Sequence, residues 1–221
     1  MPSEHVAHSH RGESLRIARL RGVTVLFPGA RALVDADVDI PAGRITALVG
    51  PNGAGKTTLL EVLAGVRRPT AGVREVHART VGFVPQRTRL PDRLPVTVHD
   101  VVSVGTWGRR RPPRSTPSAA KDAVRLALAR MDLAEIADRP FGSLSGGQRQ
   151  RALLAQGLAR HADLLLLDEP TTALDRESAD RIRAAIREEA EAGAAVVCVS
   201  HDAALIHDAD LRVTLHEGRI L

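Results

Sequence analysis

GPNGAGKTT, residues 50–58, is the stretch that decides the fold of this chain. It matches the pattern G-x-x-x-x-G-K-[S/T], and it lies between an apolar run at residues 44–49 and a run of helix formers at residues 57–65. A glycine-rich turn between a strand and a helix offers backbone N–H groups to phosphate oxygens, and the lysine adds a point charge. The stretch therefore predicts a phosphate-binding loop.

Apolar runs and helical patterns alternate along much of the remaining chain. Residues 162–170 (ADLLLLDEP) and 194–202 (AAVVCVSHD) resemble buried strands, and residues 176–193 between them place Ile182 and Ile186 four apart, as a helix does. Continuous apolar strands separated by helices are typical of a parallel sheet that is covered on both faces. The predicted fold is α/β with a mainly parallel sheet.

Residues 87–142 differ from this core because they are rich in Pro and Arg and contain one helical pattern. That pattern, residues 118–133, has Val124, Leu128 and Met131 on one face. We predict a helical subdomain inserted into a single domain, residues 15–221, whose catalytic core consists of residues 15–86 and 143–221. Residues 1–14 are predicted to be a disordered leader, and no appended domain is expected after HEGRIL at residues 216–221.

Composition narrows the class of protein. The chain has 221 residues, 43% of them hydrophobic, with no run of about 20 apolar residues and no signal-peptide pattern, so we expect a globular cytoplasmic protein. The net charge is +5, but aromatic residues make up only 2% and Tyr is absent, so no nucleic-acid partner is expected. The single cysteine, Cys198, lies in an apolar run and is predicted to be buried and inert.

Polar residues follow two of the apolar runs. Asp168 comes after four leucines, which places its carboxylate at the edge of a parallel sheet where ligands bind. We predict that Asp168 and the hydroxyl of Thr57 hold Mg²⁺ and that Glu169 is the general base of ATP hydrolysis. His201, at the end of the next apolar run, is predicted to contact the γ-phosphate. The alternatives are a charged strand end and a structural histidine.

ATP is predicted to bind along the phosphate loop. Lys56 would reach the β- and γ-phosphates, and it is one of only two lysines in an arginine-rich chain. The nucleotide-binding residues expected from this loop are Gly50, Pro51, Asn52, Gly53, Ala54, Gly55, Lys56, Thr57 and Thr58.

LSGGQRQ, residues 144–150, predicts a second anion-binding helix start. Ser145 and Gln148 fit a capping box, while Gly146 and Gly147 leave the first helix N–H groups uncovered. An ordinary capped helix is the alternative. One domain would then contain two phosphate-binding motifs.

The phosphate loop, LLLLDEP and LSGGQ together resemble the nucleotide-binding subunit of an ABC transporter, over nearly the whole chain. This resemblance implies a P-loop NTPase ABC cassette with a RecA-like core, an N-terminal antiparallel β region, and ATP and Mg²⁺ as cofactors. It also implies a dimer with a second copy of the chain, in which the LSGGQ motif (residues 144–148) of one chain closes over ATP held by the phosphate loop of the other.

Three further positions match the same family. Phe27 in VLFPGAR stands where the family places an aromatic side chain against adenine, with a strand-end core residue as the alternative. Gln86 in GFVPQR matches the glutamine that links the metal site to the membrane subunit, so the resemblance implies that Gln86 is a third Mg²⁺ ligand and a catalytic residue. Asp175 in TTALD matches the loop that crosses the dimer, although the family more often has Ser where Thr172 stands.

Related classes of protein fit the sequence less well. ABC-type ATPases of DNA repair and chromosome organisation contain long coiled coils between the two motifs, and small-molecule or nucleotide kinases have no need of LSGGQ. ABC proteins that act in translation normally carry two cassettes. Alternatives that stay open are an exporter subunit, an importer subunit for another solute, and a non-transport ABC ATPase.

Residues 81–110 resemble the branch of the family that imports zinc, manganese or chelated iron, notably in VPQR and in P-V-T-V-x-D-V-V. The resemblance implies a divalent metal importer with transmembrane permease subunits and, indirectly, an extracytoplasmic solute-binding protein. The chain would lie at the cytoplasmic face of the membrane. His5, His8 and His10 are either a metal-sensing tail or a plain leader, and residues 109–114 face phospholipid, the permease or solvent.

Overall fold

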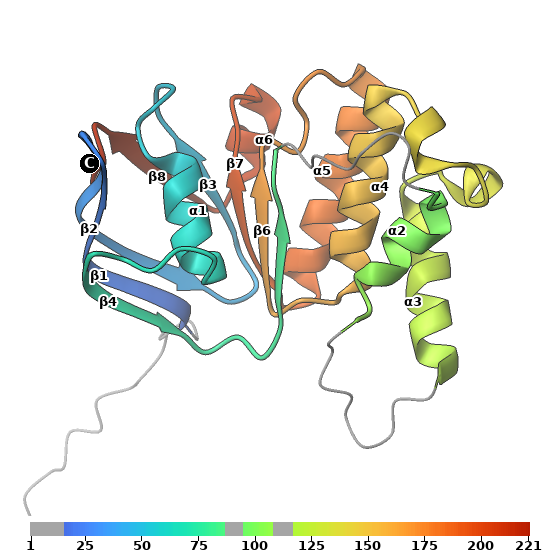
Figure 1. The fold of residues 1–221 in the computed structure, drawn as a ribbon, viewed down its shortest axis with the longest axis horizontal. Coiled ribbons are helices and arrows are strands. Elements are labelled where there is room, and N and C mark those ends of the chain that lie inside the picture. Colours follow the sequence, from blue (N-terminus) through green and yellow to red (C-terminus); the bar gives the residue numbers. More distant parts are fainter. Residues whose placement is uncertain (1–15, 87–94, 108–116) are drawn as a thin grey trace, which may run out of the picture.

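The structure is a computed structural model that describes residues 16–86, 95–107 and 117–221 (Figure 1). The predicted leader with its three histidines, and the arginine-rich stretch at residues 109–114, lie outside the described residues. Within the described ranges, no helix combines the length and the apolar character needed to cross a membrane.

A six-stranded sheet forms the centre of the molecule. Its first five strands are parallel, and the last pairs antiparallel with its neighbour, which confirms the predicted mainly parallel sheet. The strand order is β5 (Val81–Val84), β6 (Leu164–Asp168), β7 (Ala195–Val199), β3 (Ile45–Val49), β8 (Leu211–His216) and β9 (Arg219–Ile220). Every residue of β3, β6 and β7 is buried, because these apolar strands are covered on both faces.

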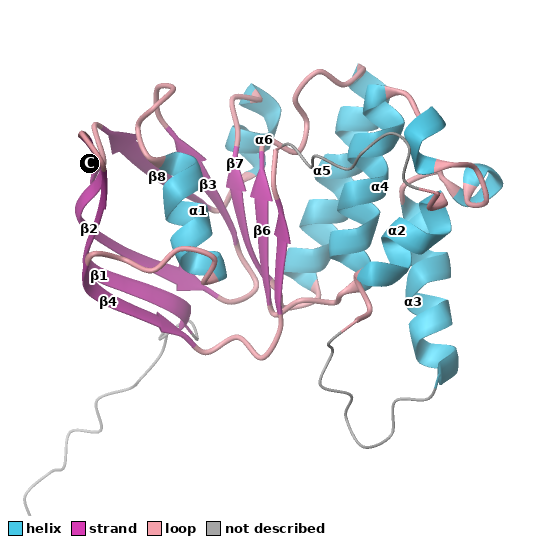
Figure 2. Cartoon of the chain, viewed as in Figure 1, coloured by secondary structure: helices cyan, strands magenta, loops and turns pink. Residues whose placement is uncertain are grey.

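A second, antiparallel sheet lies beside the first, as the family resemblance implied (Figure 2). It has the order β2 (Ala30–Pro41), β1 (Arg16–Phe27) and β4 (Ala71–Val76). The buried side chains of β1 and β2 share one apolar cluster with the helix α1 (Lys56–Ala64) and with one face of the central sheet. This sheet therefore packs on the helix that follows the phosphate loop.

The other face of the central sheet is covered by helices. These are α4 (Gly146–Ala159), α5 (Arg176–Glu191) and α6 (Ala203–Asp208). Ile182 and Ile186 of α5 are buried against this face, as their spacing predicted. Cys198 of β7 lies in the same cluster, and burial raises the pKa of its thiol, so the prediction of an inert cysteine is consistent with the fold.

The segment between β5 and α4 contains more helix than predicted. The helix α3 (Pro117–Arg130) buries Val124 and Leu128, and Met131 after it is also buried. The prediction of a single helix in this segment is wrong, because α2 (Val98–Val104) precedes it. Four of the seven residues of α2 are the β-branched Val, so its composition favours a strand. A capping box at its start overrides that preference: Thr97 Oγ1 accepts from the Asp100 N–H, and Asp100 Oδ2 accepts from the Thr97 N–H.

Both helices of this segment pack on α4, within the apolar cluster of α4, α5 and β6. Arg130 at the end of α3 also forms ion pairs with Glu188 and Glu189 of α5, with N–O distances of 2.7 and 2.6 Å. The segment is therefore joined to the core by packing and by charge. Its division from the core at residues 86/87 and 142/143 stays a prediction.

Candidate active site

The phosphate loop connects β3 to α1, and its glycines are required by the backbone. Gly50 has φ 146° and Gly55, the N-cap of α1, has φ 101°. A Cβ on Gly50 would lie 2.1 Å from the carbonyl oxygen of Leu215, and one on Gly55 would lie 2.2 Å from that of Ala32. The loop is therefore enclosed by β2 on one side and β8 on the other, and only glycine fits at these two positions.

Hydrogen bonds hold the loop in this position. The N–H of Gly218 donates to the carbonyl of Ala54 (3.1 Å), and the carbonyl of Gly218 accepts from Val34 of β2 (2.8 Å). Ala54 itself is buried, and its N–H donates to Pro51 within the loop (3.2 Å). The first turn of α1 has no side-chain cap, which leaves its N–H groups available to an anion.

Lys56 is the cation of the loop. Its side chain is almost fully buried, and Nζ donates to the carbonyls of Gly50 (2.7 Å) and Pro51 (2.9 Å). An ammonium group that is removed from bulk water interacts more strongly with phosphate than an exposed one does. The structure thus places the ammonium group at the phosphate loop, and its contact with the phosphates stays a prediction.

A cavity of about 220 Å³ lies over the loop and brings together residues from the strands β2, β6 and β7, from the helix α1, and from the loops that follow β3, β5 and β6. Its lining residues are Ala32, Asn52, Gly53, Gly55, Lys56, Thr57, Thr58, Gln86, Asp168, Glu169 and Val199. Most of the predicted phosphate-loop and metal residues therefore share one cavity, whereas Gly50, Pro51 and Ala54 do not line it.

Two of the three predicted metal ligands are in direct contact. Thr57 Oγ1 donates to Asp168 Oδ2 at 2.9 Å, and Asp168 is only 3% exposed. Burial raises the pKa of Asp168, and the bond from Thr57 opposes this only in part. A hydroxyl and a desolvated carboxylate in contact fit Mg²⁺, which prefers oxygen ligands and would supply the compensating charge. Gln86, the third predicted ligand, is exposed beyond the end of β5 and lines the same cavity.

Glu169 has an unusual backbone. Its φ is 54°, in the left-handed region, and its N–H donates to the carbonyl of Val199 (2.9 Å). Non-glycine residues adopt this conformation at a cost, and such residues cluster at functional sites. The turn directs the carboxylate into the cavity, immediately beside the metal ligands.

Two side chains hold the carboxylate of Glu169. Thr172 Oγ1 donates to Oε2 at 3.0 Å, and His201 Nε2 lies 3.2 Å from Oε1. His201 is 55% exposed, so it is not a core histidine and stands at the open side of the site. In the sequence, Thr172 stands out only as a departure from the family, and its contact with Glu169 was not predicted.

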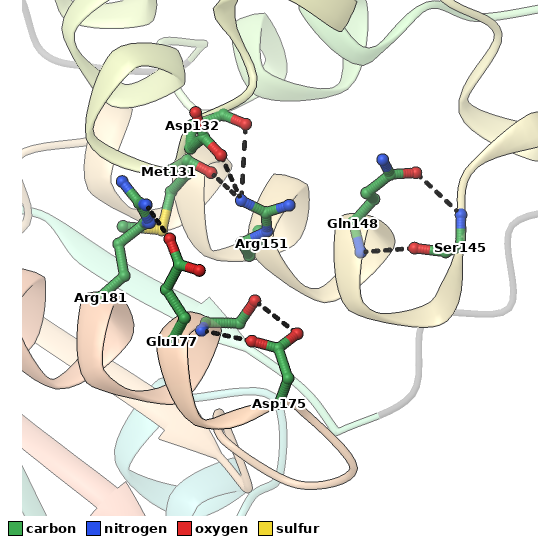
Figure 3. A network of polar contacts seen from close by, with 9 residues as sticks. Met131, Asp132, Ser145, Gln148, Arg151, Asp175, Glu177 and Arg181 are labelled. Carbon is green, nitrogen blue, oxygen red and sulfur yellow. Dashed lines mark hydrogen bonds and ion pairs between the residues drawn. The ribbon is translucent and has the colours of Figure 1, made fainter.

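The LSGGQ motif has the predicted capping box (Figure 3). Ser145 Oγ accepts from the Gln148 N–H (3.3 Å), and Gln148 Oε1 accepts from the Ser145 N–H (3.1 Å). A Cβ on Gly146 would meet open space, whereas one on Gly147 would lie 3.3 Å from Leu174. None of these four residues lines the cavity described above. The two anion-binding motifs of one chain are therefore separate.

Asp175 caps α5 in the single chain. Its carboxylate accepts from the N–H (2.8 Å) and the hydroxyl (3.0 Å) of Ser178, and these bonds lower the pKa of Asp175. Figure 3 shows Arg151 of α4 nearby, where it donates to the carbonyl of Met131 (3.0 Å) and to Asp132 (3.2 Å). Arg151 thus joins α4 to the residues that follow α3, and the cap of Asp175 lies within the start of α5. The predicted role of Asp175 across a dimer stays a prediction.

Phe27 lies at the end of β1 and is 37% exposed, so the alternative of a core residue is wrong. The guanidinium of Arg67 stacks over its ring, 4.5 Å from the centroid. Phe27 pairs with Ala30 across the β1–β2 turn, and Ala32 of the same strand lines the cavity. The strand that pairs with Phe27 thus reaches the cavity through Ala32, and the predicted contact of the ring with adenine stays a prediction.

Known proteins share both sequence and fold with this chain. The family model for ABC transporters matches residues 33–172. The hemin import ATP-binding protein of Streptomyces coelicolor is 43% identical over 217 residues, which are 92% of this chain and 76% of that protein. The zinc import ATP-binding protein of Yersinia enterocolitica is 38% identical over 193 residues, which are 86% of this chain and 72% of that protein.

Two solved structures support the same assignment. An ABC transporter described as metal-chelate type, in an inward-facing conformation, is 30% identical with a TM-score of 0.80, over 93% of this chain and 82% of that one. A dimeric bacterial ABC transporter cassette is 26% identical with a TM-score of 0.82, over 92% and 96% of the two chains. The chain described here belongs to the ABC transporter family and is an ATP-binding cassette that hydrolyses ATP.

Proposed function

We propose that this cassette powers an importer whose cargo is a metal, either chelated as in hemin or as a free divalent ion. The observation that carries the ATPase is the convergence of Lys56, the Thr57–Asp168 pair and Glu169 on one cavity. The relatives named for hemin import and zinc import, and the metal-chelate type transporter, support the direction and the class of cargo. Hemin is the first candidate because that relative is more similar, at 43% against 38% identity, and zinc is the second.

Each residue of the cavity has its own role in the proposed reaction. Lys56 and the N–H groups of the loop bind the phosphates, and Thr57 and Asp168 would hold Mg²⁺, with Gln86 beside them. When bound, Mg²⁺ would neutralise negative charge that develops on the phosphates. Glu169 accepts a proton from the attacking water, while Thr172 and His201 fix the orientation of its carboxylate.

The separate LSGGQ motif fits a dimer in which two chains complete two ATP sites. The first turn of α4 is open at Gly146, and its Ser145 cap is away from the cavity of its own chain. A second copy related by a twofold axis would place each motif over the other chain's phosphate loop. The dimeric relative at 26% identity supports this arrangement.

Substitution of Ser145 by arginine tests the dimer. In a chain that binds but does not hydrolyse ATP (Glu169→Gln), we expect Mg-ATP to produce a dimer on size-exclusion chromatography. Adding Ser145→Arg should abolish that dimer, because a bulky cation at the start of α4 blocks the partner's ATP, while each chain still binds ATP. Ser103→Arg is the control, since Ser103 lies on α2 away from the LSGGQ motif. If the double variant dimerises as well as Glu169→Gln alone, the LSGGQ motif is only a helix cap.

The proposal implies partners outside the chain. Transmembrane permease subunits would hold the cassette at the cytoplasmic face of the membrane, and a solute-binding protein would deliver cargo from the other side. Gln86, exposed beyond β5, would connect the metal site to the permease.

Loss of the gene tests the cargo. We expect a deletion strain to grow poorly when hemin is the only iron source and to recover when the wild-type gene, but not a Lys56→Ala gene, is restored. Cellular iron and zinc are measured in parallel by mass spectrometry. A zinc deficit without an iron deficit selects the second candidate, and a strain that accumulates more of both metals than its parent rules out import.

A further inference from the structure

Arg67 stacks on Phe27 and is itself held by hydrogen bonds to Glu61. The guanidinium of Arg67 covers one face of the ring, and its Nε donates to Glu61 Oε2 at 2.6 Å. The backbone N–H groups of Val66 and Arg67 both donate to the carbonyl of Glu61 (3.0 and 3.1 Å). A cation that is fixed at both its backbone and its side chain restricts the ring on which it stacks.

Glu61 connects this pair to the phosphate loop. It lies in the middle of α1, the helix that begins with Lys56 and Thr57. The ring of Phe27 is thus connected through Arg67 and Glu61 to α1, the helix that begins at the phosphate loop. It is also connected to the loop through β2, which pairs with β1 and approaches Gly55 at Ala32. Leu26 and Val66, which precede Phe27 and Arg67 in the chain, are exposed by 50% and 69%.

We propose that Arg67 determines the base-dependent part of nucleotide affinity, by holding Phe27 so that the free face of the ring receives a purine. This inference rests on the proposed nucleotide site. A ring that is fixed before binding loses less freedom when a flat base stacks on it, so the affinity for ATP rises without any new contact to phosphate. Arg67 is in this sense a positioning residue that acts through Phe27.

The experiment separates the base from the phosphates of the ligand. Equilibrium binding of Mg-ATP and of Mg²⁺ with inorganic triphosphate is measured by competition against a fluorescent ATP analogue. Arg67→Ala should weaken ATP binding about three- to fivefold, the size of one partly exposed cation–π contact, and leave triphosphate binding unchanged. Arg67→Lys keeps the charge but loses the planar stack, and it should show most of the same loss.

The neighbouring Arg68 provides the matched control. It is exposed, and Arg68→Ala removes the same charge from the next residue, so it should change neither affinity. A second test uses Phe27→Leu: if Arg67 acts through the ring, Arg67→Ala should have no further effect on ATP binding in the Phe27→Leu chain.

Three results would overturn the inference. Equal weakening of ATP and triphosphate would assign Arg67 to the phosphates, and equal effects of Arg67→Ala and Arg68→Ala would assign the loss to net charge. If a folded Arg67→Ala chain binds ATP with wild-type affinity while the Phe27→Leu chain binds ATP more weakly, then Phe27 contributes to ATP binding and Arg67 does not. The proposed nucleotide site fails separately, and only if Lys56→Ala binds ATP as the wild type does.

Discussion

Glu169→Gln is expected to slow ATP hydrolysis by about 100-fold or more while ATP binding stays at the wild-type level. The amide has the size of the carboxylate, and its oxygen can still accept from Thr172, so the turn at Glu169 is retained. The amide cannot accept the proton of the attacking water, and general base catalysis contributes about 10²- to 10⁴-fold. Phosphate release measures the first effect, and fluorescent ATP binding measures the second.

The control for this variant is Glu191→Gln, which removes the same charge from an exposed position at the end of α5. It should hydrolyse ATP at the wild-type rate. Turnover of Glu169→Gln within a factor of two of wild type would show that another group accepts the proton. In that case, the contacts of Thr172 and His201 with Glu169 would have only a structural purpose.

Lys56→Ala is expected to weaken ATP binding by about 100-fold or more and to remove measurable hydrolysis. A charged hydrogen bond contributes about 1.5–3 kcal/mol, and Lys56 would bond to two phosphate groups. Lys56→Arg should not restore binding, because Nζ lies within 2.7 and 2.9 Å of two loop carbonyls and the larger guanidinium does not fit there. ATP titration by calorimetry provides the measurement.

A loss of binding could also come from a damaged loop, since Lys56 bonds to the carbonyls of Gly50 and Pro51. Denaturant unfolding of the nucleotide-free variant separates the two effects. Lys121→Ala, which removes the only other lysine from an exposed site on α3, is the control and should bind ATP normally. Tight ATP binding by a folded Lys56→Ala chain would contradict the assignment of the loop.

The parts of the fold that could be predicted depend on residues that are neighbours in the sequence, or on apolar residues that repeat every three to four positions. The phosphate loop is one continuous motif, and Asp168 follows directly from the apolar run of β6. The buried faces of α3 and α5 repeat every three to four residues, so they can be found without knowing what they contact. The capping box of Ser145 and Gln148 is likewise local.

The parts that were missed depend on tertiary contacts or on a choice between weak local preferences. Arg67 meets Phe27 only because the fold brings the residues that follow α1 to the end of β1, and no periodic pattern in the sequence connects them. The contact between Thr172 and Glu169 follows from the left-handed turn at Glu169, for which glutamate gives no signal. The helix α2 was missed because its valines favour a strand and its cap decides otherwise.

The phosphate loop is enclosed by residues that are synthesised at very different times. Ala32 of β2 precedes the loop, whereas Leu215 and Gly218 follow it by most of the length of the chain. At ordinary translation rates, the ribosome makes Gly218 on the order of ten seconds after the loop. A nascent chain therefore carries the complete phosphate-binding motif long before it has the strand β8, and the loop becomes enclosed on both sides only after β8 has been made.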